Sequence, residues 1–128
     1  GAQLKIVGSF LNALKESRAW PELASATLTA MQHFPREAGP PLLQAQALAD
    51  QGQNDKAFAW FEQANRLNTR NVEGYYGLAD CLRRRGELRP AMSLLEQGLR
   101  YDPYHHASLQ LLRQLQQEQQ ATMAKALS

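Results

Sequence analysis

The stretch VEGYYGLADCLRRRGELRPAMSLLEQGLRYDP, residues 72–103, decides the fold of this chain. Its apolar residues recur at steps of three and four on both sides of Gly86, and this spacing predicts two amphipathic helices joined by a short turn. Gly86 follows three arginines and stands where a helix commonly ends on a left-handed residue. Pro103 then starts the next segment with a fixed φ. The stretch therefore predicts a helical hairpin.

The same pattern occurs 34 residues earlier, where Gly52 takes the place of Gly86. Other positions repeat at the same step, in the pairs Ala45/Ala79, Leu48/Leu82, Ala57/Ala91 and Ala64/Gly98. A fixed period of this length predicts stacked units, each of which buries its apolar face against the next. The paired alanines allow two helices to cross closely, and Phe61 and Leu95 are expected to fill the space between successive units.

Small, aromatic, glycine and proline positions at a 34-residue step resemble the tetratricopeptide repeat, a helix–turn–helix unit. The resemblance is strong over residues 38–105 and weaker at both ends. It implies an all-α fold, a right-handed α-solenoid of helical hairpins with a C-terminal capping helix. We expect one domain over residues 1–128. Its parts are a degenerate repeat at 4–37, repeats at 38–71 and 72–105, and a capping or partial-repeat helix at 106–126.

Several residues depart from the repeat pattern. Gln44 occupies a position where a large apolar residue is usual, and Leu11, Leu23 and Thr27 break the small-small-aromatic order of the first repeat. We therefore expect the first repeat to be degenerate or to pack differently from the others. Arg113 stands where close helix contact needs a small residue, and the glutamine-rich segment that follows it predicts a last helix with a solvated outer face.

The resemblance also implies a binding surface, because first helices line a concave groove in this family. The groove positions are Gln46, Asp50, Glu73, Tyr76, Asp80, Arg83, Arg84, Gln110 and Gln114. This mixed polar row with one aromatic side chain suits an extended peptide or a partner helix. One subclass of the family grips chaperone C-termini with a Lys, Asn and Arg clamp. The corresponding positions here are Leu42, Gln46, Gly77, Ala107 and Leu111, which form no such clamp.

Composition excludes several classes of function. Fourteen Lys and Arg residues against twelve Asp and Glu give a formal charge of +2, which argues against a nucleic-acid partner. The single cysteine, Cys81, cannot supply a disulfide framework or a multi-cysteine metal site. No apolar run reaches the roughly 20 residues of a membrane span. The opening Gly1 to Leu4 lacks an initiating Met and a basic leader, so we expect a fragment of a larger protein. The richness in Leu, Ala, Arg and Gln fits a bacterial protein of this family. Cytoplasmic and periplasmic locations both stay open.

Two clusters suggest chemistry but have simpler interpretations. His105 and His106 beside Asp102 are expected to be solvated imidazoles in a turn between repeats rather than a metal or acid–base site. The arginines at 83–85 and 89 suit a solvated helix end, although a phosphate or an acidic polymer is a second interpretation. No nucleophile–base spacing and no glycine-rich phosphate loop accompany them. We therefore expect no enzymatic activity, no cofactor and no metal.

Three functional hypotheses follow. The first is a non-enzymatic scaffold that binds a protein or peptide partner in the groove. The second is a structural spacer within a longer periplasmic repeat array of a bacterial envelope or polysaccharide export system. The third is weak self-association into a homo-oligomer through the exposed first helix or the glutamine-rich last one.

Overall fold

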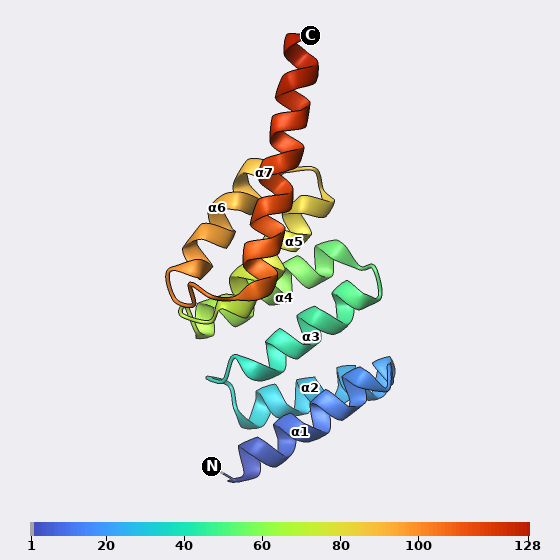
Figure 1. The fold of residues 1–128 in the computed structure, drawn as a ribbon. Coiled ribbons are helices and arrows are strands. Elements are labelled where there is room, and N and C mark those ends of the chain that lie inside the picture. Colours follow the sequence, from blue (N-terminus) through green and yellow to red (C-terminus); the bar gives the residue numbers. More distant parts are fainter. Residues whose placement is uncertain (1) are drawn as a thin grey trace. The chain divides into compact units, whose positions relative to one another are not determined.

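The computed structural model describes residues 2–128, and every regular element in that range is an α-helix (Figure 1). The chain divides into two compact units, residues 1–69 and residues 70–128. The first unit consists of α1 (Ala2–Glu16), α2 (Trp20–His33), α3 (Gly39–Asp50) and α4 (Asn54–Leu67). The second consists of α5 (Val72–Arg84), α6 (Leu88–Leu99) and α7 (His106–Leu127). The all-α prediction is confirmed, whereas the division into individual repeats stays a prediction.

The two turn glycines have the left-handed conformation that their positions predicted. Gly52 has a φ of 77° and Gly86 a φ of 82°. After α5, the amide of Gly86 donates to the carbonyl of Arg83 at 2.9 Å and the amide of Glu87 to that of Leu82 at 2.9 Å. These two bonds satisfy carbonyls that the helix end would otherwise leave unpaired. The prediction that each glycine marks the turn of a hairpin is confirmed.

Arg18 occupies the equivalent turn position after α1, 34 residues before Gly52. It is the one non-glycine residue with a positive φ, 60°, in the described chain. Its guanidinium carbon lies 5.3 Å from the centre of the Trp20 ring, a cation–π distance. The first hairpin therefore has the same turn geometry as the others. Arginine takes the place of glycine, the residue that adopts a positive φ with the least strain.

The core of the first unit accommodates the departures from the repeat pattern. Leu11 and Leu23 are buried together with Ala30 and Ala47 in one apolar cluster. Thr27 of α2 is also fully buried, and its hydroxyl donates to the side-chain oxygen of Gln44 on α3 at 2.8 Å. Two polar residues that each break the pattern thus satisfy each other. The residues that depart from the repeat pattern are thus part of the packing of the first unit.

The second unit is built around the crossing of α5 and α6. Ala79 on α5 and Ala91 on α6 are both fully buried. Gly98 lies so close to α5 that a Cβ atom added to it would come within 2.8 Å of the Tyr75 Cβ. This contact explains why a residue without a side chain occupies position 98.

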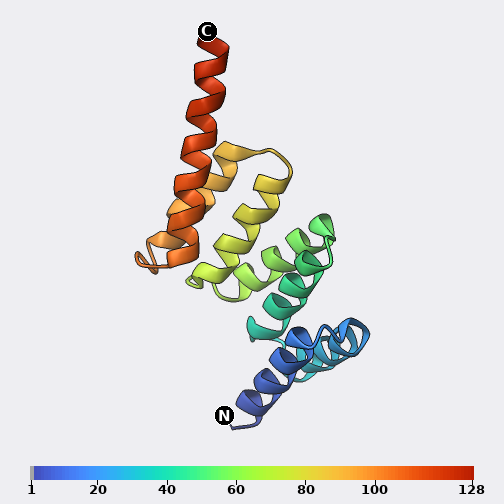
Figure 2. The ribbon, with the colours of Figure 1, turned by 45° about the vertical axis from the view of Figure 1, so that its right-hand side comes forward.

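The last helix packs through its first half only. Leu111 and Leu115 are buried on the side of α7 that faces α6 and α5. Beyond them the helix extends past the other helices of its unit (Figures 1 and 2), and its side chains are exposed apart from the half-buried Gln119. The solvated outer face predicted for this helix is confirmed. Among residues 2–128, no helix has the length and apolar composition needed to cross a membrane.

Candidate functional site

Five of the predicted groove residues form a row along α5 of the second unit. They occur at steps of three and four residues, which places them on one face of the helix. Their side chains are half-buried or exposed, whereas the opposite face of α5 carries the buried core residues. We call these residues the α5 row: Glu73, Tyr76, Asp80, Arg83 and Arg84.

At the C-terminal end of the α5 row, Asp80 holds two arginines. Arg83 donates to one carboxylate oxygen, Oδ1, through Nε at 3.0 Å and through a terminal nitrogen at 2.8 Å. Arg84 reaches the other oxygen, Oδ2, at 3.1 Å. Because these side chains remain partly exposed to solvent, each ion pair stabilises the fold by at most about 1 kcal/mol. Their main effect is to fix two planar guanidinium groups beside Tyr76.

Tyr76 occupies the middle of the α5 row and is half-buried. Burial raises the pKa of its hydroxyl above the ordinary value, and the nearby charge of Asp80 raises it further. The phenol is therefore neutral at physiological pH and keeps its hydrogen-bond donor. The ring of His105 meets that of Tyr76 edge-on, with 5.9 Å between the ring centres. This aromatic pair places an apolar surface beside the charged side chains of the row.

His105 connects the α5 row to α7. Its Nδ1 accepts a hydrogen bond from the Ser108 amide at 3.2 Å and so caps the N-terminus of α7. A ring nitrogen that accepts has no hydrogen, so the imidazole proton lies on Nε2, which is 3.0 Å from an oxygen of Glu73. The expectation of a solvated imidazole is therefore wrong for His105, whose side chain is only 15% exposed. His106, the next residue, is exposed.

The order Ser108–His105–Glu73 is that of a nucleophile, a base and an acid. The Ser108 hydroxyl lies 2.7 Å from Nδ1, and sequence reasoning found no such arrangement. A substrate must nevertheless reach the nucleophile, and Ser108 is 1% exposed. The arrangement supports the start of α7 and the position of the Tyr76 ring.

One feature of the sequence predicts the contact between His105 and Glu73. His105 follows Glu73 by 32 residues, close to one period of 34. Residues one period apart occupy equivalent places on neighbouring first helices, so the starts of α5 and α7 are expected to be adjacent. In the sequence, His105 is next to His106 and close to Asp102. These neighbours drew attention to a metal or acid–base site or a solvated turn, and not to a contact with Glu73.

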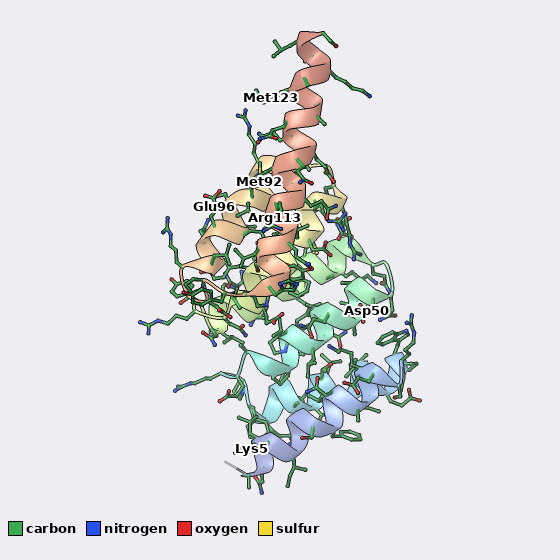
Figure 3. The ribbon with its side chains drawn as sticks, viewed as in Figure 1. Lys5, Asp50, Met92, Glu96, Arg113 and Met123 are labelled. Carbon is green, nitrogen blue, oxygen red and sulfur yellow. The ribbon has the colours of Figure 1, made fainter. Side chains whose placement is uncertain are left out.

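The remaining predicted groove residues lie elsewhere. Gln110 and Gln114 are exposed on α7, where Gln114 donates to Glu118 at 3.2 Å, one turn along the same helix. Gln46 and Asp50 belong to α3 of the first unit. The side-chain oxygen of Gln46 accepts from the Lys15 ammonium at 3.0 Å, and Asp50 is exposed at the end of α3 (Figure 3). A continuous row that includes all these residues stays a prediction.

No group of three or more His, Cys, Asp or Glu side chains is placed to hold a metal ion in the described part of the chain. Cys81 is buried in α5.

The hairpins and their left-handed turns define the class of protein as a helical-repeat protein. The model of a family described as "Tetratricopeptide repeat" matches residues 48–115, more than half of the chain. The protein belongs to the tetratricopeptide repeat family.

Solved structures agree with this fold. The first tetratricopeptide domain of human RPAP3 superposes with a TM-score of 0.83 at 17% identity, covering 93% of this chain and 94% of that one. The first such domain of Spaghetti (RPAP3), bound to the HSP90 peptide SRMEEVD, gives 0.82 at 18% identity, with 88% and 92% covered. The Arabidopsis OM64 domain gives 0.81 at 14% identity, with 89% and 94% covered. A search of curated proteins found no significant match.

Proposed function

We propose that the protein is a non-enzymatic scaffold whose α5 row binds an extended peptide or a helix of a protein partner. The observation that carries the proposal is the juxtaposition of a half-buried aromatic pair, Tyr76 with His105, and a fixed pair of arginines, Arg83 and Arg84. Aromatic and arginine side chains dominate the binding energy of protein interfaces. The protein belongs to the tetratricopeptide repeat family, and a solved domain with a similar fold is bound to a peptide. Both findings support a peptide-binding function.

The charge distribution indicates what such a peptide presents. Residues 80–89 contain four arginines against one Asp and one Glu, a net charge of +2, which equals the formal charge of the whole chain. A guanidinium group pairs best with carboxylate or carbonyl oxygens. We therefore expect a peptide with an apolar residue for the aromatic pair and oxygen acceptors for the arginines.

A displayed library of random peptides tests the proposal, because such a library requires no identified partner. Peptides selected on the purified chain are measured by isothermal titration calorimetry against Tyr76→Ala and Arg83→Glu. We expect each substitution to weaken binding at least about tenfold, the effect of a residue central to an interface. The matched controls are Tyr104→Ala and Arg100→Glu, two exposed residues outside the α5 row, which should leave the dissociation constant unchanged.

Equal binding by Tyr76→Ala and the parent chain would contradict the proposal. A library that yields no specific peptide would favour the spacer hypothesis, since a spacer within a longer array needs no binding row.

A further inference from the structure

His105 joins the N-terminal ends of two helices of the second unit. Its Nδ1 accepts a hydrogen bond from the Ser108 amide at the start of α7, and its Nε2 lies 3.0 Å from the Glu73 carboxylate in the first turn of α5. The side chain of Asn71 caps α5 by accepting from the Glu73 amide at 3.0 Å, which holds that turn in place. Both ring nitrogens of His105 are therefore engaged by groups that the helix ends position.

The cap of α7 requires a neutral ring. A ring nitrogen accepts a hydrogen bond only while it carries no proton, so a proton from solvent that binds Nδ1 removes the acceptor of the Ser108 amide. That amide is one of the first-turn donors that α7 cannot satisfy with its own carbonyls. The new Nδ1–H still finds an acceptor, because the Ser108 hydroxyl oxygen lies 2.7 Å away. Protonation of His105 thus replaces the cap of α7 with a bond to a hydroxyl group.

Glu73 makes the protonated state of His105 accessible. A charged ring that is only 15% exposed needs a partner, because burying an unpaired charge is costly. The Glu73 carboxylate already lies at hydrogen-bond distance from Nε2, and this contact becomes a charge-assisted bond when the ring is positive. Histidine is also the side chain that changes its charge between about pH 5 and pH 8. The proton is therefore gained and lost in the range in which proteins work.

Other charged groups near His105 do not take the place of Glu73. The titratable side chains that meet the imidazole are Glu73 and Tyr76, both from α5. In the turn before α7, the Asp102 carboxylate accepts from a backbone amide of the same turn, and His106 is exposed. Helix α6 packs on both α5 and α7, and none of its charged side chains contacts the ring in the described part of the chain. Glu73 is therefore the counter-ion of a protonated His105.

The charge of His105 affects the α5 row through Tyr76. The two rings form the aromatic pair that is expected to receive an apolar residue of the peptide. An apolar side chain that covers a charged imidazole removes water from it without providing a new partner, which costs free energy. Loss of the cap also destabilises the start of α7, the segment that holds the His105 ring against Tyr76. Both effects weaken binding of the peptide when His105 is protonated.

We propose that His105 is a pH-sensitive switch, which lets the α5 row bind its peptide when the ring is neutral and releases the peptide when the ring is protonated. In the neutral form, Nδ1 caps α7 and the aromatic pair carries no charge. In the protonated form, the Ser108 amide loses its acceptor and the ring carries a positive charge paired with Glu73. The release of the peptide rests on the function proposed for the α5 row, whereas the change at the start of α7 does not.

NMR spectra of the free chain between about pH 5 and pH 8 test the change at the start of α7. The Ser108 amide should titrate with the same midpoint as the His105 ring, and its proton signal should move upfield as the amide loses its acceptor. In His105→Asn the side chain keeps a capping acceptor and has no titrating group, so the Ser108 amide signal should stay constant.

The matched control is His106→Asn, a substitution of the exposed neighbouring histidine, which should titrate as the parent chain does. A Ser108 amide that does not follow His105 in the parent chain, or that still titrates in His105→Asn, would overturn the proposal. Circular dichroism checks that the variants fold, and the titration of the parent chain needs no variant.

Isothermal titration calorimetry with a library-selected peptide that contains no histidine tests the release. We expect the dissociation constant of the parent chain to be about threefold to tenfold larger at about pH 5.5 than at about pH 7.5. His105→Asn should bind equally at both values. Because protonation and binding oppose each other, saturating peptide should also move the titration of His105 to lower pH.

Failure of the switch differs from failure of the proposed function. A peptide that requires Tyr76 but binds the parent chain equally at both pH values, or more tightly in acid, would overturn the switch and leave the proposed function intact. Equal binding by Tyr76→Ala and the parent chain would instead contradict the proposed function, and the Ser108 amide would still titrate with His105.

Discussion

The hydrogen bond between Thr27 and Gln44 replaces an apolar contact of the repeat pattern, and Thr27→Val tests what it contributes. Thr27 is fully buried, and its hydroxyl has two acceptors, Gln44 at 2.8 Å and the Ala24 carbonyl at 3.0 Å. Valine keeps the shape of the side chain and removes the donor. The Gln44 oxygen then loses its partner inside the α2–α3 interface.

The burial of Gln44 determines how much free energy of unfolding is lost in Thr27→Val. A buried acceptor left without a donor costs about 1–3 kcal/mol, and Gln44 is half-buried, so water partly replaces the donor. We therefore expect Thr27→Val to lower the free energy of unfolding by about 1 kcal/mol, at the low end of that range. The corresponding change in Tm is about 3–5 °C for a chain of this size.

A double substitution distinguishes this explanation from a simple packing defect. Gln44→Leu restores the apolar residue that the repeat pattern expects at position 44, and alone it removes one acceptor from the Thr27 hydroxyl. With both polar groups replaced, nothing is left unpaired, so the double variant should recover stability. The coupling energy between the two sites should be about 1 kcal/mol.

Urea unfolding followed by circular dichroism measures all three variants. Thr29→Val is the matched control, because Thr29 is an exposed threonine of the same helix whose hydroxyl bonds only to the Ser25 carbonyl. It should change the free energy of unfolding by no more than about 0.5 kcal/mol. Additive losses in the double variant, or a Thr27→Val variant as stable as the parent chain, would show that the Thr27–Gln44 hydrogen bond does not stabilise the fold.

Further predictions concern single positions. Gly86→Ala should lower the free energy of unfolding by about 1–2 kcal/mol, since alanine is strained at a φ of 82° although nothing crowds the site. Gly8→Ala, in an open helical position, should instead raise it by about 0.5–1 kcal/mol. A loss at both sites in urea unfolding would contradict this. Gly98→Ala should cost about 1–3 kcal/mol because its Cβ would meet Tyr75 at 2.8 Å, and a melting temperature equal to that of the parent chain would disprove the close approach. Burial raises the pKa of Tyr76, so its contribution to stability is present below the unfolded value of about 10 and disappears as the pH rises through the folded value. Urea unfolding at pH 9 and pH 11 should show a smaller alkaline loss for Tyr76→Phe than for the parent chain, and equal losses would argue against the shift.

The period of the sequence predicted the elements of the fold well. The backbone conformations of Gly52 and Gly86 and the burial of the alanines at the crossings follow from the 34-residue step, and the solvated end of α7 follows from its glutamine-rich sequence. These features depend on local geometry and on small side chains at fixed positions. Both the turn positions and the small residues can be recognised directly in a periodic sequence.

Contacts made by residues that depart from the expected pattern were harder to predict. Thr27 and Gln44 each count as a departure when considered alone, and only their 2.8 Å contact shows that one compensates for the other. Arg18 likewise takes a glycine position, with Trp20 beside it. His105 lies in a turn between repeats, where a solvated side chain is expected, whereas its partner Glu73 is 32 residues away. A single sequence shows which residue type stands at each position. These three features depend instead on contacts between pairs of residues, which a single sequence does not show.

Amide chemical shifts measured while a library-selected peptide is added locate the binding surface of the protein. If the α5 row binds the peptide, the largest shifts in the ¹⁵N spectrum fall on Glu73, Tyr76, Asp80 and Arg83 and on His105 at the start of α7. Exposed residues of α6 such as Glu96 should shift little (Figure 3). Largest shifts on α6 or in the first unit, with the α5 row unchanged, would show that the α5 row is not the binding surface.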